Sequence, residues 1–305
     1  MRIFVTGASG FIGRNVVELL CSDSNKLLLL VKDNNERKIL QKYNRKVIVG
    51  DFKNISNFKK EIKGFNPQVF IHLAWEGIPD FSFNMCKKNL DNSLALSNFI
   101  INETDCKKII VSGSCLEYGK THGECKESDN VNINSFFSWA KYSLYCYLRF
   151  MCKKLNKDLI WFRIFYAYGH GQRKDSLIPK FIHSFINGKR PNINNPLNAN
   201  DFIHISDIAS AFRCAVNKKI KSGIYNLGSG KSTRVIDICK TIGKIINKKI
   251  CISNTIKKVN CDSGKTLNYW ANINKTQKAL SWKANISIKN GIKYYLKDSY
   301  LKDEI

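Results

Sequence analysis

The 305-residue chain has no long apolar run, no paired cysteines and few acidic side chains, and each absence excludes a class of protein. Its longest purely aliphatic run, Leu27 to Val31, is far shorter than the roughly 20 residues that span a bilayer. The first strand is expected to start at Ile3, which leaves no room for a signal peptide ahead of it. We therefore expect a cytoplasmic protein that does not enter a membrane.

The 11 cysteines are scattered, and no two form a Cys-x-x-Cys pair. An odd number of scattered cysteines in a chain of this length is not typical of a disulfide framework or a zinc site. We expect reduced thiols and no metal.

Lys and Arg outnumber Asp and Glu by 50 to 24, which gives a formal net charge of +26. The lysines are spread among asparagines along the whole chain and form no stripe interleaved with aromatic residues, as a nucleic-acid surface would. We expect no nucleic-acid partner. The positive field would instead attract a small anionic substrate.

What the sequence does have is a glycine-rich turn near its start. The apolar run Ile3 to Val5 is followed by Gly7, Gly10 and Gly13, and then by apolar residues with helical spacing. A strand, a tight turn and a helix in this order are typical of dinucleotide binding, because the glycines let the backbone approach a diphosphate. The charge of the diphosphate then lies at the positive end of the helix.

Further buried strands alternate with helices along the first half of the chain. The expected strands are Leu27 to Val31, Val47 to Val49, Val69 to Ala74, Ile109 to Ser112 and Leu159 to Phe162, and the expected helices include 84–103 and 136–154. This alternation predicts an α/β fold with a parallel, doubly wound Rossmann sheet. We assign residues 1–164 to the cofactor-binding domain and 165–305 to a smaller α/β substrate-binding region. Residues 201–227 are expected to return strands to the first domain.

Ordered motifs along nearly the whole chain resemble the extended short-chain dehydrogenase/reductase family, which contains nucleotide-sugar epimerases, dehydratases and reductases. The matching segments are 6–13, 50–51, 72–74, 112–119, 140–141, 163–169, 201–207 and 225–230. Several matches in order are far more specific than any one of them. The resemblance also implies a homodimer, formed through helices 84–103 and 136–154.

The resemblance implies a catalytic set of Ser or Thr, Tyr, and a Lys four residues after the Tyr. The Lys holds the nicotinamide ribose, and its charge lowers the pKa of the Tyr, which exchanges a proton with the sugar oxygen. The hydroxyl falls on Ser114 and the lysine on Lys141. The tyrosine position is Phe137, which has no hydroxyl.

A phenylalanine at this position has three interpretations: an engineered variant made to trap a substrate complex, a natural loss of catalysis, or a wrong alignment. We favour the first, because Ser114, Lys141 and the glycine turn are intact. Loss of a general acid lowers a rate by about a hundredfold to ten-thousandfold. We therefore expect the chain to bind its substrate better than it turns it over.

The resemblance further implies which dinucleotide binds. In NAD-preferring members an acidic residue ends the second strand and binds the ribose. That position is Lys32 here, and Arg14, Arg37 and Lys38 are also available for a 2′-phosphate, which favours NADP over NAD. The alternative is that Asp33 performs the acidic role. The expected cofactor contacts are Gly7, Gly10, Phe11, Ile12, Gly13, Arg14, Lys32, Asp51, Phe52, Leu73, Ala74, Trp75, Lys141 and Phe165.

On the substrate side, the dehydratase branch places Asp and Glu directly after its catalytic Thr, where this chain has Cys115 and Leu116. Segments 115–119 and 165–172 look most like those of reductases, so the resemblance implies NADPH-dependent reduction of a nucleotide-linked 4-keto-6-deoxysugar in polysaccharide synthesis. An NAD-retaining nucleotide-sugar 4-epimerase and an inactive dinucleotide-binding protein are the alternatives. The expected substrate contacts are Ser114, Cys115, Glu117, Ser176 and Leu177.

The roles of Glu117 and of the residues expected on the substrate diphosphate each have an alternative in the sequence. Glu117 can instead be a solvated carboxylate at a strand end. The family usually has two arginines on the substrate diphosphate, and their positions are Asn200 and Asp262 here.

Overall fold

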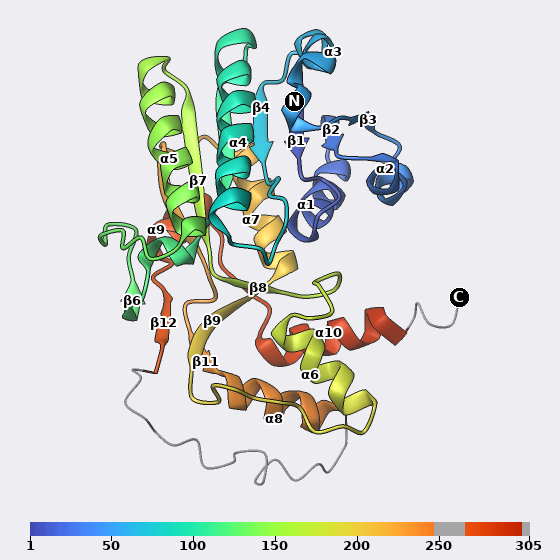
Figure 1. Ribbon diagram of the computed structural model, residues 1–305, viewed down its shortest axis with the longest axis vertical. Helices are drawn as coiled ribbons and strands as arrows, with labels where there is room; N and C mark the ends of the chain where they lie inside the picture. Colours follow the sequence, from blue (N-terminus) through green and yellow to red (C-terminus); the bar gives the residue numbers. More distant parts are fainter. Residues whose placement is uncertain (247–265, 301–305) are drawn as a thin grey trace.

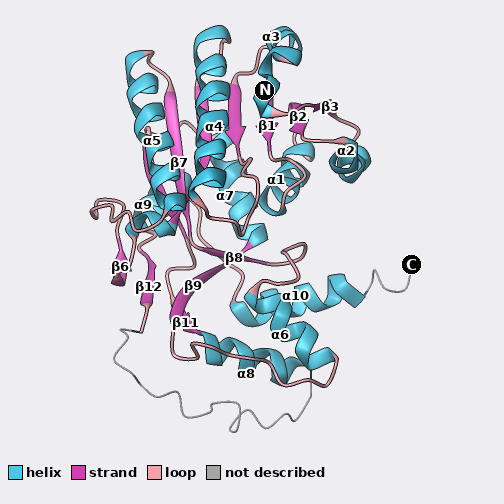
Figure 2. Ribbon diagram, in the orientation of Figure 1, coloured by secondary structure: helices cyan, strands magenta, loops and turns pink. Residues whose placement is uncertain are grey.

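The larger part of the molecule is a parallel sheet of seven strands in the order β10-β7-β5-β4-β1-β2-β3. The computed structural model describes residues 1–246 and 266–300, and shows helices on both faces of this sheet (Figures 1 and 2). The α/β class and the doubly wound parallel sheet are therefore confirmed. The strands are β1 (Arg2–Thr6), β2 (Lys26–Val31), β3 (Lys46–Val49), β4 (Val69–His72), β5 (Lys108–Ser114), β7 (Asp158–Ile164) and β10 (Gly223–Leu227).

Two hydrophobic cores lie on the two faces of this sheet. Because both faces are covered, the strands are apolar at nearly every position rather than at alternate ones. On β1, for example, Ile3 and Val5 join the core that contains side chains of α1 and α7, while Phe4 joins the core with α4 and α5. The helices around the sheet are α1 (Phe11–Cys21), α2 (Asn34–Leu40), α3 (Lys59–Phe65), α4 (Phe83–Glu103), α5 (Phe136–Lys154), α7 (Ile205–Asn217) and α9 (Asn274–Leu280).

The smaller part lies beyond the carboxyl ends of these strands and has a sheet of its own (Figure 1). Its path is β11-β9-β12-β6, and β8 pairs with β9. The elements are β6 (His122–Cys125), β8 (Tyr166–Tyr168), β9 (Ala199–His204), β11 (Ser232–Arg234), β12 (Asn268–Ala271), α6 (Leu177–Ile186), α8 (Val235–Ile245) and α10 (Ile288–Tyr300).

The expected return of residues 201–227 to the main sheet is right for one strand and wrong for the other. β10 pairs in parallel with β7 and forms the edge of the main sheet. β9 lies in the smaller sheet, because the edge of β7 is already taken by β10 and β9 pairs with β11 and β12. Since β6 precedes residue 164, the smaller region takes strands from both sides of the expected boundary.

In the part of the chain that the structure describes, no helix is both long and apolar enough to cross a bilayer. Nor do three or more His, Cys, Asp or Glu side chains in that part gather as metal ligands would.

Candidate active site

The glycine turn lies at the carboxyl end of β1, beside the end of β4, where open parallel sheets bind their ligands. Gly7 has φ +67°, and a Cβ at this position would lie 2.6 Å from the amide nitrogen of Ala74. A Cβ on Gly13 would collide with the carbonyl oxygen of Gly7. Both positions therefore require glycine, because the turn approaches the segment after β4 and helix α1 too closely for a side chain.

Helix α1 begins at Phe11 with Gly10 as its N-cap, and no side chain caps it. The first backbone amides of the helix, including those of Phe11 and Ile12, thus remain available to an anion at the positive end of the helix dipole. The close glycine turn and the uncapped helix start fit the diphosphate of a dinucleotide.

Charged side chains at the end of β2 surround the expected ribose position. Lys32 is 54% exposed, and its ammonium lies 3.8 Å from the carboxylate of Glu76. The Asp33 carboxylate caps α2 by accepting a hydrogen bond from the Glu36 amide, and the Glu36 carboxylate accepts one from the Lys32 amide. Both acids are therefore held by backbone amides.

Four more expected cofactor contacts lie near this edge. Asp51 caps the short helix η2 (Phe52–Asn57), whose first residue meets the ring of His72 edge to face at 6.5 Å. Leu73 donates its backbone amide to the Thr6 carbonyl at 3.2 Å. The Arg14 guanidinium donates to the Gly171 carbonyl, and burial lowers the pKa of Arg14. Arg14 thus ties α1 to the loop after β8.

His72 is buried and links three elements through hydrogen bonds, a role that the sequence alone did not predict. Its Nδ1 lies 2.7 Å from Thr6 Oγ1 and its Nε2 lies 2.9 Å from Ser93 Oγ, so it joins β4 to β1 and α4. Burial lowers the pKa of His72 to about 3, which keeps the ring neutral.

Ser114 lies at the end of β5, and Lys141 reaches the same strand from helix α5. Ser114 caps the short helix η3 (Cys115–Tyr118), and its Oγ accepts a hydrogen bond from the Leu116 amide at 3.1 Å. The Ser114 hydroxyl proton therefore stays available for a substrate oxygen. Lys141 Nζ donates to the carbonyl of Ser112 at 2.9 Å, two residues before Ser114 on the same strand.

Aromatic rings surround the Lys141 ammonium and the Phe137 side chain. The centroid of the Trp75 ring lies 4.2 Å from Lys141 Nζ and 5.1 Å from the centroid of the Phe137 ring. The Phe81 ring also packs on Phe137, with 4.9 Å between the two centroids. Lys141 is only 4% exposed, and burial lowers its pKa to about 8. The indole nitrogen of Trp75 is buried and has no hydrogen-bond partner among the described residues.

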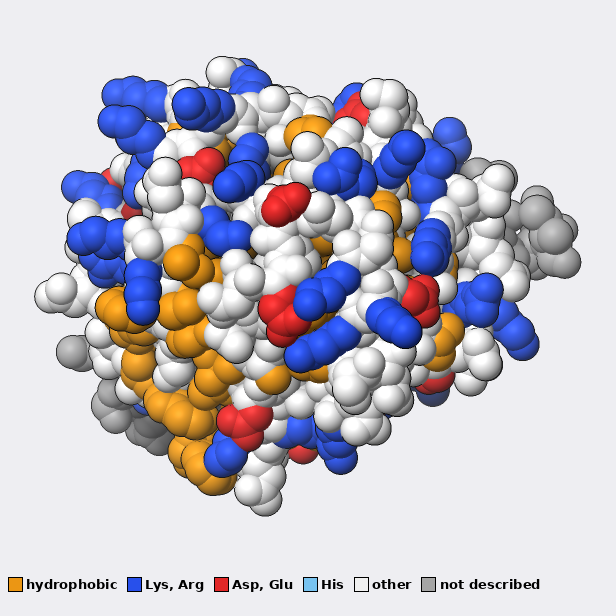
Figure 3. Space-filling model, turned by 90° about the horizontal axis from the view of Figure 1, so that it is seen from above, with side chains coloured by type: hydrophobic (Ala, Val, Ile, Leu, Met, Phe, Trp, Pro, Cys, Tyr) orange, Lys and Arg blue, Asp and Glu red, His pale blue; other side chains and the backbone are white. Residues whose placement is uncertain are grey.

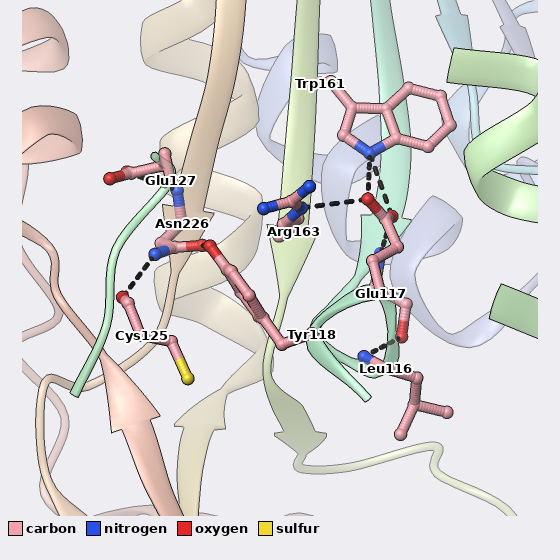
Figure 4. A network of polar contacts seen from close by, with 9 residues as sticks. Leu116, Glu117, Tyr118, Cys125, Glu127, Trp161, Arg163 and Asn226 are labelled. Atoms are coloured by element: carbon pink, nitrogen blue, oxygen red, sulfur yellow. Dashed lines mark hydrogen bonds and ion pairs between the residues drawn. The ribbon is translucent and has the colours of Figure 1, made fainter. Parts of the chain in front are cut away.

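The expected roles of Glu117 are wrong, because this carboxylate is neither solvated nor placed to contact a sugar. Glu117 is fully buried and accepts hydrogen bonds from Arg163 Nε at 2.9 Å and from Trp161 Nε1 at 3.0 Å (Figure 4). It also accepts the Ser114 amide at 2.9 Å. A signal was present in the sequence, since Trp161 and Arg163 alternate on a buried strand, and a charge on such a strand needs a buried partner.

Two further expected contacts, Cys115 and Phe165, have buried side chains, and their contacts with substrate and cofactor stay predictions. The Cys115 thiol lies in a small core beside the hydroxyl of Tyr269, at 3.8 Å. The ring of Phe165 lies in the same core, between Tyr118 and Tyr269.

The remaining expected contacts lie in the smaller region or outside the described residues. Ser176 is the N-cap of α6, and Leu177 is its first residue. Asn200 is on β9, and its buried Oδ1 has no hydrogen-bond partner in the described part of the chain. Asp262 lies outside the described residues.

The model of the NAD dependent epimerase/dehydratase family matches residues 3–228, which is most of the chain. The chain belongs to this family. Among its curated relatives, a dTDP-4-dehydro-6-deoxyglucose reductase from Escherichia coli is 29% identical over 263 residues, which cover 82% of this chain and 83% of the relative.

Solved structures of the family share the fold. The structure of UDP-glucose 4-epimerase from Thermotoga maritima with UDP-glucose has a TM-score of 0.83 at 20% identity. The match covers 100% of this chain and 99% of the epimerase. UDP-glucuronic acid 4-epimerase from Bacillus cereus was solved as a tyrosine-to-phenylalanine mutant with UDP-4-deoxy-4-fluoro-glucuronic acid and NAD. It has a TM-score of 0.84 at 21% identity, with all of both chains covered.

Proposed function

We propose that the protein reduces a nucleotide-linked 4-keto-6-deoxysugar to the 4-hydroxy sugar with NADPH. The preference for NADPH over NADH rests on the residues at the end of β2. Lys32 is exposed there, whereas the carboxylates of Asp33 and Glu36 are engaged by backbone amides. A 2′-phosphate would therefore meet an exposed ammonium, whose ion pair with Glu76 is a long one at 3.8 Å, and this favours NADP as a dissociable reductant. The Escherichia coli reductase, matched over four-fifths of both chains, supports the same reaction.

The residues of the site divide the work between binding and orientation. The amides at the start of α1 would hold the diphosphate, and Lys141 would hold the nicotinamide ribose. A dinucleotide bound there supplies the hydride. The hydroxyl proton of Ser114 is free to bind the ketone oxygen, because Ser114 Oγ already accepts from Leu116.

Phe137 occupies the position of the family's tyrosine, and its ring packs against Trp75 and Phe81. We expect Phe137→Tyr to raise turnover by about a hundredfold or more, because it restores a general acid. A substrate-trapping variant remains our interpretation of Phe137, and a tyrosine-to-phenylalanine mutant is a form in which a relative was solved with a substrate analogue.

A nucleotide-sugar 4-epimerase that retains NAD is the second candidate. One observation favours it: the Glu36 carboxylate lies against the Lys32 amide, and a carboxylate at this position repels a 2′-phosphate. Stoichiometric NAD released on denaturation of the purified protein would support the epimerase.

We also propose a homodimer through α4 and α5. Exposed aromatic side chains are found along both helices, among them Phe83, Phe136 and Phe150, the last of which is 66% exposed. Hydrophobic side chains gather at the lower left of Figure 3, the side on which α5 lies in Figure 1. Sedimentation of the protein as a monomer at micromolar concentration would contradict the dimer.

The test of the reaction is oxidation of NADPH and of NADH by the protein and by Phe137→Tyr, with a panel of nucleotide-linked 4-ketosugars. Oxidation of NADPH by either protein, with a sugar alcohol as product, supports the reductase. Absence of turnover in both, despite tight dinucleotide binding, contradicts it and favours the epimerase or an inactive binding protein.

A further inference from the structure

We propose that Lys141 is the proton donor of this chain, in place of the hydroxyl that Phe137 lacks. The inference rests on the proposed reduction and concerns the same site. It makes the protein a slow enzyme rather than an inactive one.

Two of the three N–H donors of the Lys141 ammonium have no acceptor among the described residues. An ammonium has three N–H donors, and the described residues offer one acceptor, the Ser112 carbonyl at 2.9 Å. The other close neighbours are ring faces, with Trp75 at 4.2 Å and Phe137 at 5.9 Å from Nζ. The ring at position 137 therefore lies beside an ammonium that has unused donors.

No carboxylate contacts this ammonium within the described residues. The charged and titratable groups that face it are Glu117 from η3, Cys86 from α4 and His72 from β4. Glu117 is engaged by Arg163, burial raises the pKa of the Cys86 thiol, and His72 is neutral because burial lowers its pKa to about 3. Lys141, whose pKa burial lowers to about 8, is thus the group of this set that titrates near neutral pH.

The nearby tyrosines are poor alternatives. The Tyr118 hydroxyl donates to Asn226 Oδ1 at 2.8 Å, and burial raises its pKa. The hydroxyl of Tyr166 lies 2.9 Å from that of Tyr269, and burial raises the pKa of Tyr166 to about 12. Both phenols are engaged elsewhere and hold their protons more tightly than Lys141 does.

The chemical step balances with a nicotinamide dinucleotide as the reductant. The carbonyl carbon of the ketosugar accepts a hydride, so the ketone is reduced and the dinucleotide is oxidised. One N–H bond of the Lys141 ammonium breaks and an O–H bond forms on the sugar oxygen. The neutral amine that remains takes a proton from solvent before the next turnover. Ser114 orients the oxygen that receives the proton.

The test compares Lys141→Arg in two backgrounds, because arginine keeps the positive charge but does not release a proton at neutral pH. With Phe137 in place, we expect turnover to fall as pH rises through about 8, and Lys141→Arg to lower turnover at least a hundredfold. In the Phe137→Tyr protein, whose phenol donates the proton, the same lysine change should cost less than about tenfold. Because Lys141 also holds the ribose in the proposed function, NADPH affinity is measured by its fluorescence for every variant, and turnover is compared at saturating NADPH so that a loss of binding is separated from a loss of proton transfer.

A second readout does not depend on turnover. In protein labelled with ¹⁵N-lysine, the amino resonance absent from Lys141→Arg reports the titration of Lys141. A midpoint near pH 8 supports the proposal, and a midpoint above about 10, the ordinary lysine range, overturns it.

The outcomes separate this inference from the proposed function. Turnover that appears only with Phe137→Tyr, or that survives Lys141→Arg with Phe137 in place, supports the reduction but overturns Lys141 as the donor. Absence of turnover in every variant removes the proposed reduction, and the inference with it.

Discussion

Among the described residues, the two cations Arg163 and Lys141 are buried, and their surroundings are opposite. Arg163 is 1% exposed, forms an ion pair with Glu117 and lies 4.4 Å from the Tyr118 ring centroid. Lys141 is 4% exposed and meets a backbone carbonyl and two aromatic rings. Equal burial therefore gives Arg163 a fixed charge and Lys141 a charge that is easily lost.

The difference follows from how each charge is compensated. A buried ion costs several kcal/mol of desolvation unless a partner offsets it, and Glu117 offsets this cost for Arg163. Lys141 has no such partner among the described residues, so its pKa falls instead. The Arg163 pair still serves the site, because Glu117 also accepts the amide of Ser114 and so fixes the hydroxyl. Arg163 supports the candidate site through Glu117, and Lys141 is the proposed proton donor in it.

The largest expected effect comes from removing the partner of Arg163. Glu117→Gln leaves a buried guanidinium without its counter-charge, and we expect the free energy of unfolding to fall by about 3–5 kcal/mol. Urea denaturation followed by circular dichroism measures it.

A matched control is Glu103→Gln, which removes an exposed carboxylate bridging Lys59 and Lys63. Exposed pairs of this kind contribute about 0–1 kcal/mol, so this variant should unfold almost as the parent does. Equal losses in the two variants would contradict the contrast between a buried and an exposed ion pair.

The second prediction concerns removal of the other buried cation, Lys141. In Lys141→Met the buried charge is gone, and below pH 8 we expect the variant to be more stable than the parent, by on the order of 3 kcal/mol. Lys141 has a pKa of about 8 in the folded protein and the ordinary 10.5 in the unfolded chain. Between these values the unfolded chain binds more protons, so the stability of the parent rises with pH relative to the variant.

Urea midpoints of both proteins at several pH values from 7 to about 10 measure this convergence. The other titrating groups are common to both proteins and cancel in the difference. A constant difference across the range would show that Lys141 keeps its ordinary pKa.

The sequence predicted where Lys141 lies in the fold but not the ion pair between Arg163 and Glu117. The glycine turn, the parallel strands, and the positions of Ser114 and Lys141 depend on contiguous residues or on backbone geometry, so local patterns predict them. The partner of Glu117 lies 46 residues away on β7, and packing alone brings the two together. For this reason the sequence misassigned Glu117 to the substrate.

The aromatic surroundings of Lys141 were hidden for a related reason. Trp75 and Phe81 lie in the loop between β4 and α4, and a loop has no periodicity from which the direction of its side chains can be predicted. β9 was misplaced because its apolar residues suit either sheet, and the choice was made by β10 taking the edge of β7.

The smallest expected effect tests whether the Trp75 ring holds the Lys141 charge. A ring face near a buried ammonium stabilises the charged form by about 0.5–2 kcal/mol, so Trp75→Leu should lower the Lys141 titration midpoint by about one pH unit. Trp75→Phe keeps a ring and should lower it by less. The ¹⁵N-lysine titration measures both, with Trp139→Leu as a control, since that tryptophan stacks on Phe83 instead. If Trp75→Leu and the control leave the same midpoint, burial alone sets the pKa of Lys141.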